Sequence, residues 1–329
     1  MPKVRFREID IIKGICMLLV FWNHSILYFP VNFRELYPIC KLMVDVVGSW
    51  YMPCFFMVSG FLFANSRKSW SIVMNDKIKR LVVPYLFVCM VSLGMKLLMP
   101  SMAAFTQGGW SERLHYYLLE GGDRWFLYIL FWIFFLVTPF RKYIVKSTFT
   151  VCLTLLLVYT LSEENWFPFI YPLQRILIFT RYFLIGFLVR RFYTEIRKCF
   201  DSYWILFLVL FVIYNIIINN YCDGRFWSLI LPIIGSFACF SISIKLTSVK
   251  SFLSCKIVDF IEWVGKYSLQ FYIMTGFVLM PARTIIVMKL GIVNPVIVIP
   301  VIFIFQVALA TLAVVICKKF KIMNFLMGY

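Results

Sequence analysis

Lys13 and His24 are the two residues whose types and spacing first suggest chemistry. They lie eleven positions apart in an apolar stretch that begins near Arg5 and that we expect to be a membrane helix. At about 100° per residue, this separation makes three turns plus about 20°, so both side chains would lie on one face, roughly 16 Å apart along the axis. An ammonium group at one end of a helix face and an imidazole near the other would suit an elongated ligand with an anionic head.

His24 carries the side chain best suited to proton transfer. A neutral imidazole can take a proton from a hydroxyl group and return it to a leaving group near neutral pH. The other histidine, His115, falls in an expected loop, which leaves His24 as the intramembrane candidate for a general base. The alternative is a packing histidine that bonds to a neighbouring helix. Asp45, at the start of the second expected span, could orient the imidazole or cap its helix.

Lys13 has both a structural and a functional interpretation. Asp10 lies three residues earlier on the same helix, so the two could pair near the cytoplasmic interface. The lysine could also extend its ammonium group to water there. A charged group in hydrocarbon is costly, however, and is a functional hypothesis by default. In that interpretation Lys13 faces an anionic group that enters from the cytoplasm, with Asp10 as a further possible substrate contact.

Further basic and aromatic residues lie along the chain. Lys77 and Arg80, spaced i, i+3 and so on one face of a short helix that enters the third expected span, could bind phosphates or serve as ordinary cytoplasmic anchors. Arg175 and Arg181 fall within the sixth expected span, where each requires an acidic partner, a water-filled cavity or an anionic ligand. Trp125 opens the fourth expected span and could be an interfacial tryptophan or a substrate contact.

For the other residues of reactive types, helix packing is a better explanation than a catalytic role. Ser59 has no G-x-S-x-G elbow around it, so helix packing explains it best. The ten cysteines show no C-x-x-C spacing and lie mostly in apolar runs, where they resemble small membrane hydrophobes. We therefore assign no metal site, and a bridge between Cys40 and Cys222 is the one disulfide that we consider. Glu163 is expected to be a solvated acid of an outer loop.

The elements that position these residues follow from composition. The hydrophobic fraction is 62%, the charged fraction 15% and the mean hydropathy +0.88. Soluble domains are only about 45–50% apolar, so we predict an all-α, polytopic integral membrane protein that forms a single transmembrane domain over residues 1–329. The net charge of +18 could indicate a nucleic-acid partner. Lysine and arginine in cytoplasmic loops explain it better, and we expect no such partner.

Hydropathy predicts ten transmembrane helices. Their approximate ranges are 8–29, 45–65, 82–100, 125–140, 148–162, 171–189, 203–219, 227–244, 267–288 and 296–317. With the N-terminus in the cytoplasm, the inner segments hold 22 of the 33 lysines and arginines and the outer segments hold six. This asymmetry follows the positive-inside rule, so both termini are predicted to be cytoplasmic.

Several of these segments together resemble the membrane-bound acyltransferase-3 family, and within it the fucose 4-O-acetylase-like and polysaccharide O-acetyltransferase branch. The matching segments are Lys13-x10-His24, Phe55–Phe61, Lys77-x-x-Arg80, Trp125–Leu127 and, more weakly, Gly265–Tyr272. Two positions depart from the pattern. Lysine stands at 13 where many members have arginine, which loses the bidentate fork, and Thr275 stands where many members have histidine.

The resemblance implies ten helices, an acyl-CoA donor taken from the cytoplasm and an acyl group delivered to a sugar hydroxyl. Acetyl-CoA would be a co-substrate, and the acceptor a cell-surface glycan or a lipid-linked sugar in the inner (cytoplasmic) membrane. His24 would be the catalytic histidine, whereas Lys13, Lys77 and Arg80 would bind the donor. The sequence leaves direct transfer and an acyl-enzyme route equally open.

A transporter, flippase or polymerase for an anionic lipid-linked glycan is the competing class. Its intramembrane arginines would contact the lipid-linked sugar instead of CoA. The chain shows no internal repeat of the kind common in transporters and no long outer loop to house a glycan.

Overall fold

The computed structural model describes residues 5–27, 32–98, 110–163, 171–221, 225–249 and 251–328. These residues form helices and turns, with no strand among them. They group into two compact units that interleave along the chain. The first unit holds residues up to Ala64, Tyr182–Ser268 and Asn294–Phe303, and the second holds Asn65–Arg181, Leu269–Val293 and the residues from Ile304 onward.

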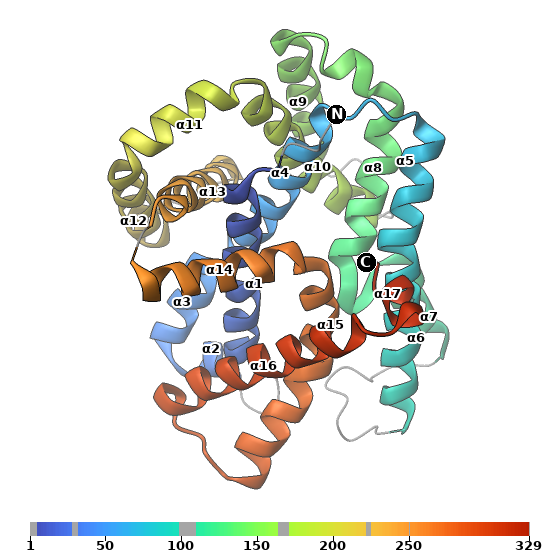
Figure 1. Ribbon diagram of the computed structural model, residues 1–329, viewed down its shortest axis with the longest axis vertical. Coiled ribbons are helices and arrows are strands. Elements are labelled where there is room, and N and C mark those ends of the chain that lie inside the picture. The colour runs from blue at the N-terminus through green and yellow to red at the C-terminus, as the bar shows by residue number, and fades with distance from the viewer. Residues whose placement is uncertain are drawn as a thin grey trace. The chain divides into compact units, whose positions relative to one another are not determined.

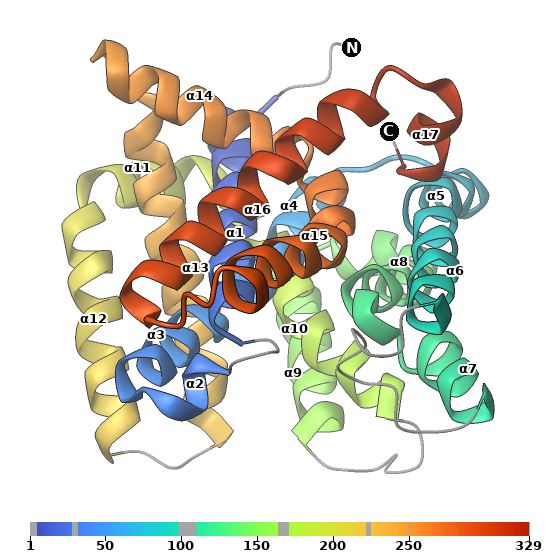
Figure 2. The ribbon, with the colours of Figure 1, turned by 90° about the horizontal axis from the view of Figure 1, so that it is seen from below.

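The helices of the first unit surround its N-terminal helix. They are α1 (Arg7–Leu27), α2 (Phe33–Leu36), α3 (Pro38–Gly48), α4 (Tyr51–Ala64), the end of α10 (Tyr171–Arg191), α11 (Tyr193–Ser202), α12 (Trp204–Tyr221), α13 (Arg225–Thr247), α14 (Phe252–Lys266) and the start of α16 (Pro295–Cys317). Helix α1 packs against α14, α13, α4 and α3, and α14 crosses it near its N-terminal end (Figure 1). Helix α12 lies beside α13 (Figure 2).

The second unit is built from the middle and the C-terminal part of the chain. Its helices are α5 (Trp70–Lys77), η1 (Ile78–Val82), α6 (Val83–Leu98), α7 (Trp110–Leu119), η3 (Gly122–Arg124), α8 (Trp125–Ile144), α9 (Thr148–Glu163), the start of α10, α15 (Ser268–Arg283), η4 (Thr284–Lys289), the end of α16 and α17 (Lys321–Leu326). Short α5 packs on α8, and η1 is a π-helical turn that joins α5 to α6.

Glycines let helices approach closely in the first unit. A Cβ atom on Gly14 would lie 2.0 Å from the carbonyl oxygen of Ile261, and one on Gly265 would lie 1.7 Å from that of Asp10. No side chain fits there, so the backbones of α1 and α14 are in direct contact. Small residues at such crossings are the usual way to pack helices in a membrane, where lipid tails supply no hydrophobic driving force.

Seven helical segments of the described residues are long and apolar enough to cross a membrane. They are Arg7–Leu27, Pro38–Ala64, His115–Ile144, Pro172–Arg191, Leu229–Leu246, Ser268–Lys289 and Pro295–Cys317. The apolar helices Thr148–Glu163 and Trp204–Asn215 are shorter. Each of the ten predicted spans overlaps a helix, and the all-helical, multi-pass character of the protein is confirmed. The number ten and the side on which the termini lie stay predictions.

Candidate functional site

Helix α1 carries Lys13 and His24 on one uninterrupted run of helix, Arg7–Leu27. Eleven residues of regular helix place both side chains on one face, roughly 16 Å apart. Both residues are partly exposed, whereas the neighbouring Ile12 and Asn23 are buried. The predicted spacing is therefore preserved in the folded helix. Each of the two side chains keeps part of its surface exposed, whereas Met17 and Val20, which lie between them on the same face, are buried.

Asp10 and Lys13 pair at the N-terminal end of this helix. The Lys13 ammonium lies 2.8 Å from one Asp10 oxygen, and Arg5 donates to the other at 3.0 Å. The Lys13 side chain is 20% exposed and the Asp10 side chain 13%. The two residues thus form the ion pair that the structural interpretation predicted. If Lys13 also binds a ligand, it does so while its ammonium group is paired with the Asp10 carboxylate.

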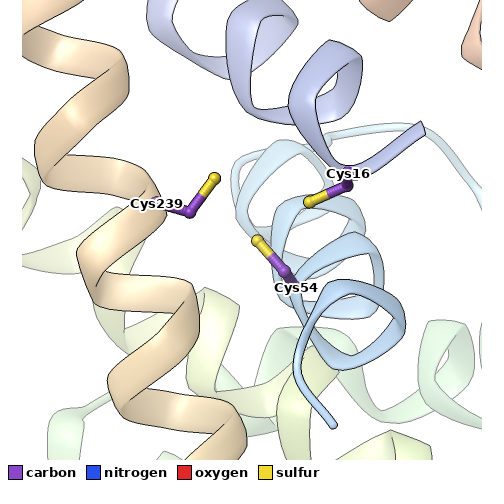
Figure 3. A group of neighbouring side chains, drawn as sticks. All are labelled: Cys16, Cys54 and Cys239. Atoms are coloured by element: carbon purple, nitrogen blue, oxygen red, sulfur yellow. The ribbon is translucent and has the colours of Figure 1, made fainter. Parts of the chain in front are cut away.

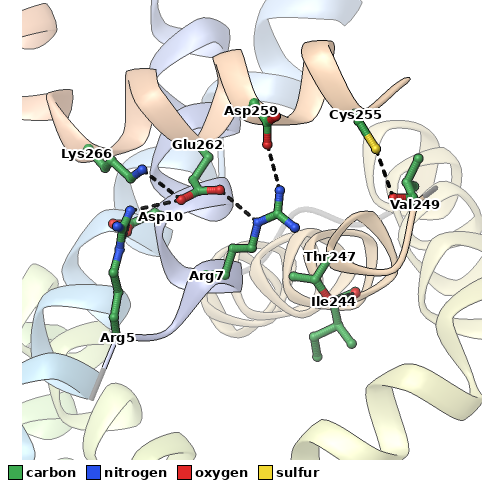
Figure 4. A network of polar contacts seen from close by, with 10 residues as sticks. All are labelled: Arg5, Arg7, Asp10, Ile244, Thr247, Val249, Cys255, Asp259, Glu262 and Lys266. Atoms are coloured by element: carbon green, nitrogen blue, oxygen red, sulfur yellow. Dashed lines mark hydrogen bonds and ion pairs between the residues drawn. The ribbon is translucent and has the colours of Figure 1, made fainter. Parts of the chain in front are cut away.

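Glu262 of α14 is the centre of the neighbouring contacts (Figure 4). Its carboxylate accepts from Arg5 at 2.9 Å, from Arg7 at 2.8 Å and from Lys266 at 2.9 Å, while Arg7 also donates to Asp259 at 2.8 Å. We call the whole set the α1–α14 ion cluster; its members are Arg5, Arg7, Asp10, Lys13, Asp259, Glu262 and Lys266. Four cations face three carboxylates in it, so the cluster keeps one positive charge in excess.

The other end of α1 holds neutral polar groups. The amide nitrogen of buried Asn23 donates to the hydroxyl of Tyr51 at 3.1 Å, which ties α1 to α4 next to His24. Asp45 lies inside α3, so it caps no helix, and its carboxylate accepts from Arg34 at 2.7 Å. A role for Asp45 in orienting His24 stays a prediction and would have to compete with this ion pair.

Lys77 and Arg80 differ in their surroundings within the second unit. The Lys77 ammonium lies 3.6 Å from the ring centroid of Phe134 in α8, a cation–π distance. Arg80 belongs to the π-helical turn η1 and is exposed. A π-turn is wider than an α-turn, so residues at i and i+3 do not stack on one face as we predicted from α-helical spacing. Lys77 faces an aromatic ring, whereas Arg80 is open to an anionic ligand.

Arg181 has the acidic partner that its depth requires. Its side chain is 6% exposed, and one guanidinium nitrogen donates to Glu163 at 2.6 Å. Glu163 ends α9 and is 20% exposed, so the expectation of a solvated loop acid is wrong. The carboxylate satisfies the buried cation, because an ion pair with good hydrogen-bond geometry offsets much of the cost of desolvation.

Trp125 and Arg175 were predicted separately, and the fold brings them together. The Arg175 guanidinium carbon lies 4.4 Å from the Trp125 ring centroid, and the ring of Phe179 lies 5.1 Å from the same indole. Arginine over the face of tryptophan is the most favourable form of the cation–π contact. These residues form one aromatic–cation group at the start of α8.

Arg124, which precedes this tryptophan, is a buried cation that the sequence did not predict. It is 5% exposed and donates to the carbonyl oxygens of Asp123 and Ile273, each at 3.1 Å. A Cβ on Gly276 would lie 2.5 Å from its guanidinium, so the glycine makes room for it. Its position next to a tryptophan that begins a span could have drawn attention to it. A charged residue at such a position is normally expected to be solvated, however, so it was not predicted to be buried.

Three cysteines also came together unexpectedly. Cys16, Cys54 and Cys239 lie in different helices of the first unit, and their sulfurs are neighbours. Their separation in sequence hid the group, since metal-ligand patterns are recognised by short spacings. Cys40 is a free thiol, and Cys222 lies outside the described residues. The disulfide that we considered between them therefore also lies outside the described part of the chain.

Comparison with known proteins identifies one family. The family model described as an acyltransferase domain, that of acyltransferase-3, matches residues 6–317. No curated protein and no solved structure matches the chain. The matched range contains every candidate residue discussed above.

Proposed function

The chain belongs to the acyltransferase-3 family and is an acyltransferase, and on this basis we propose that it transfers an acyl group from acyl-CoA to a sugar hydroxyl. The acyl group that we propose first is acetyl. The acceptor is a cell-surface glycan or its lipid-linked precursor. The apolar helices make the chain a multi-pass membrane protein, and we place it in the inner membrane with the donor arriving from the cytoplasm.

The observation that carries this proposal is the single helix α1, which holds Lys13 and His24 on one face with each side chain partly exposed. Acyl-CoA is long, with phosphates at one end of its pantetheine arm and the thioester at the other. Phosphates near Lys13 would leave the thioester close to His24, because about 16 Å of helix separates the two residues. The excess positive charge of the α1–α14 ion cluster favours an anion at this end.

The reaction uses His24 as a general base. Its neutral imidazole removes the proton from the acceptor hydroxyl as the oxygen attacks the thioester carbonyl. The carbon–sulfur bond then breaks, and the CoA sulfur takes the proton from the imidazolium. The products are an O-acyl sugar and free CoA, and the histidine returns to its neutral form.

Donor binding extends to Arg80 in this proposal. Arg80 is exposed and can form charge-assisted hydrogen bonds to phosphate, whereas Lys77 first has to leave the Phe134 ring. Trp125 and Arg175 are proposed to contact the acceptor, since an aromatic face beside a guanidinium suits a sugar that carries an anionic group. Arg181, held by Glu163, is proposed to position α10, the helix that carries Arg175.

The test measures transfer of labelled acetyl from acetyl-CoA to extracted surface glycans in membranes that contain the intact protein or His24→Ala. We expect loss of about 10²–10⁴-fold in rate, the usual contribution of a general base. His115→Ala is the matched control, since this histidine is 60% exposed and pairs with Glu120. Equal labelling by His24→Ala and the intact protein at equal expression would make His24 a packing residue.

A different result would change the class of protein. If the intact protein labels no glycan with any short-chain acyl-CoA, yet its vesicles take up a labelled lipid-linked glycan, the transport interpretation replaces this one.

A further inference from the structure

Cys16, Cys54 and Cys239 bring three thiol groups together inside the first unit (Figure 3). Their sulfurs all lie within 4.8 Å of one another, and the residues are 0%, 0% and 2% exposed. The residues belong to α1, α4 and α13, and each sulfur points into the space that the three helices share. All three are free thiols.

The surrounding helices hold this group in place. Helix α1 packs against both α4 and α13, and α4 packs against α13. Met17 and Phe240, next to Cys16 and Cys239 in sequence, are buried, as is Phe56 on α4. A binding event at the sulfurs would therefore require little rearrangement of the backbone.

The ligand set selects the class of ion. Within the described part of the chain, neither histidine nor a carboxylate joins the three cysteines. Hard cations such as Ca²⁺ and Mg²⁺ require oxygen ligands, and structural Zn²⁺ almost always takes four protein ligands. A soft monovalent ion suits thiolate sulfur alone, and Cu(I) is the first-row ion of that kind. We propose that Cys16, Cys54 and Cys239 form a binding site for one Cu(I) ion.

The geometry agrees with that ion. Metal–sulfur bonds are about 2.3 Å long, so three sulfurs in a plane around one ion lie about 4 Å apart. Starting from separations of no more than 4.8 Å, each sulfur has to move towards the centre by at most about 0.5 Å, which side-chain rotation supplies.

Charge also favours a singly charged ion with few thiolates. Binding releases two of the three thiol protons to water, because thiolate is the form that binds metal. Two thiolates, one neutral thiol and Cu(I) carry a net charge of −1. A single net charge costs less desolvation free energy in a dry interior than a double charge does. No change of oxidation state is involved. The ion would tie α1 to α4 and α13 and stabilise the helix that carries Lys13 and His24.

The experiment uses the full chain purified in detergent under anaerobic conditions, with Cu(I) supplied from a bathocuproine disulfonate complex of known affinity. We expect one Cu(I) per chain and a copper X-ray absorption spectrum with two or three sulfurs at about 2.3 Å. Replacing Cys16, Cys54 and Cys239 together by serine should weaken binding by at least about 100-fold, since even the loss of supporting groups around a metal costs up to that factor.

Matched variants decide between this site and the other thiols. Cys152→Ser and Cys199→Ser alter exposed cysteines and should retain full binding. The proposal is overturned if the competitor keeps all the copper, if the triple variant binds as tightly as the unmodified chain, or if the spectrum contains nitrogen or oxygen ligands. The spectrum comes from the unmodified chain, so it decides the matter even if the triple variant does not fold. None of these results depends on acyl transfer.

Discussion

The two ends of helix α1 are built in opposite ways. Its N-terminal end joins the α1–α14 ion cluster and lies directly against the backbone of α14 at Gly14 and Gly265. The residues after Lys13 include no aspartate, glutamate, lysine or arginine, and the last turns hold the Asn23–Tyr51 hydrogen bond and His24. One end is therefore fixed by charge and close packing, and the other carries the imidazole of His24.

This difference suits a long substrate with unlike ends. Charged groups concentrated at one end of a helix can attract phosphates without raising the polarity near the reacting atoms. The following substitutions test whether the N-terminal end does hold the helix and whether Lys13 does more than pair with Asp10.

The largest effect is expected for Gly265→Val. The new side chain would meet the Asp10 carbonyl oxygen, 1.7 Å from the ideal Cβ position, and backbone cannot move aside as a side chain can. Overpacking usually costs about 1–3 kcal/mol, and here we expect at least the upper value. Thermal unfolding in detergent measures it. Gly94→Val is the control, since no atom lies within 4 Å of its Cβ position, and equal losses in both variants would show that the α1–α14 contact is looser than described.

Lys13→Ala is expected to raise the KM for acyl-CoA by about tenfold or more, the equivalent of one charged hydrogen bond. Lys266→Ala removes another cation of the same cluster, at 36% exposure, and should leave this KM nearly unchanged. Steady-state kinetics over a range of donor concentrations provide the comparison. A lower unfolding temperature with an unaltered KM would restrict Lys13 to its ion pair with Asp10.

Glu262→Gln should lower the free energy of unfolding by about 1–2 kcal/mol, because Arg5, Arg7 and Lys266 lose their shared carboxylate. Asp259→Asn is the comparison, since that side chain is 64% exposed and holds Arg7. Its effect should stay below about 0.5 kcal/mol. Similar values for both would mean that the cluster behaves as separate surface pairs rather than as a network.

The smallest effect is expected for the ion pair of Lys68 and Asp76, an exposed reference for the cluster. The hydrogen bond from Lys68 lowers the pKa of Asp76 from its ordinary value of 3.8. The pair therefore stabilises the folded state above that pH, and its contribution disappears as the pH falls through the lowered pKa. Asp76→Asn should cost no more than about 0.5 kcal/mol at pH 7, and progressively less as the pH falls through the lowered pKa. A constant difference from pH 7 to pH 2 would exclude the ion pair as its cause.

The sequence predicted the helices well because hydropathy is a local property. Runs of about twenty apolar residues are readable without knowledge of their neighbours. The span predicted at 45–65 is the exception, since the structure divides that part of the chain between α3 and α4 and begins the apolar segment at Pro38. The turn at Ser49 and Trp50 leaves no mark in a hydropathy average.

The candidate site was predictable only where it lies on one helix. Lys13 and His24 share α1, so helical geometry alone relates them, and the Asp10–Lys13 pair follows from the same rule. The partner of Arg181 could not be predicted, because Glu163 belongs to another helix and helical spacing does not relate the two residues. The contact between Trp125 and Arg175 could not be predicted for the same reason, because these residues also belong to different helices.

By itself, the sequence determined that this protein is helical and lies in a membrane, and it related Lys13 to His24, since hydropathy and helical phase depend on neighbouring residues alone. Only the tertiary structure decided which charges are neutralised: Glu262 meets Arg7 across helices distant in sequence, and Glu163 meets Arg181 across two consecutive helices. It also decided that Cys16, Cys54 and Cys239 form one group. The physical reason is that ion pairs and ligand sets depend on distances of a few ångströms between helices, and packing at glycines such as Gly265 sets those distances.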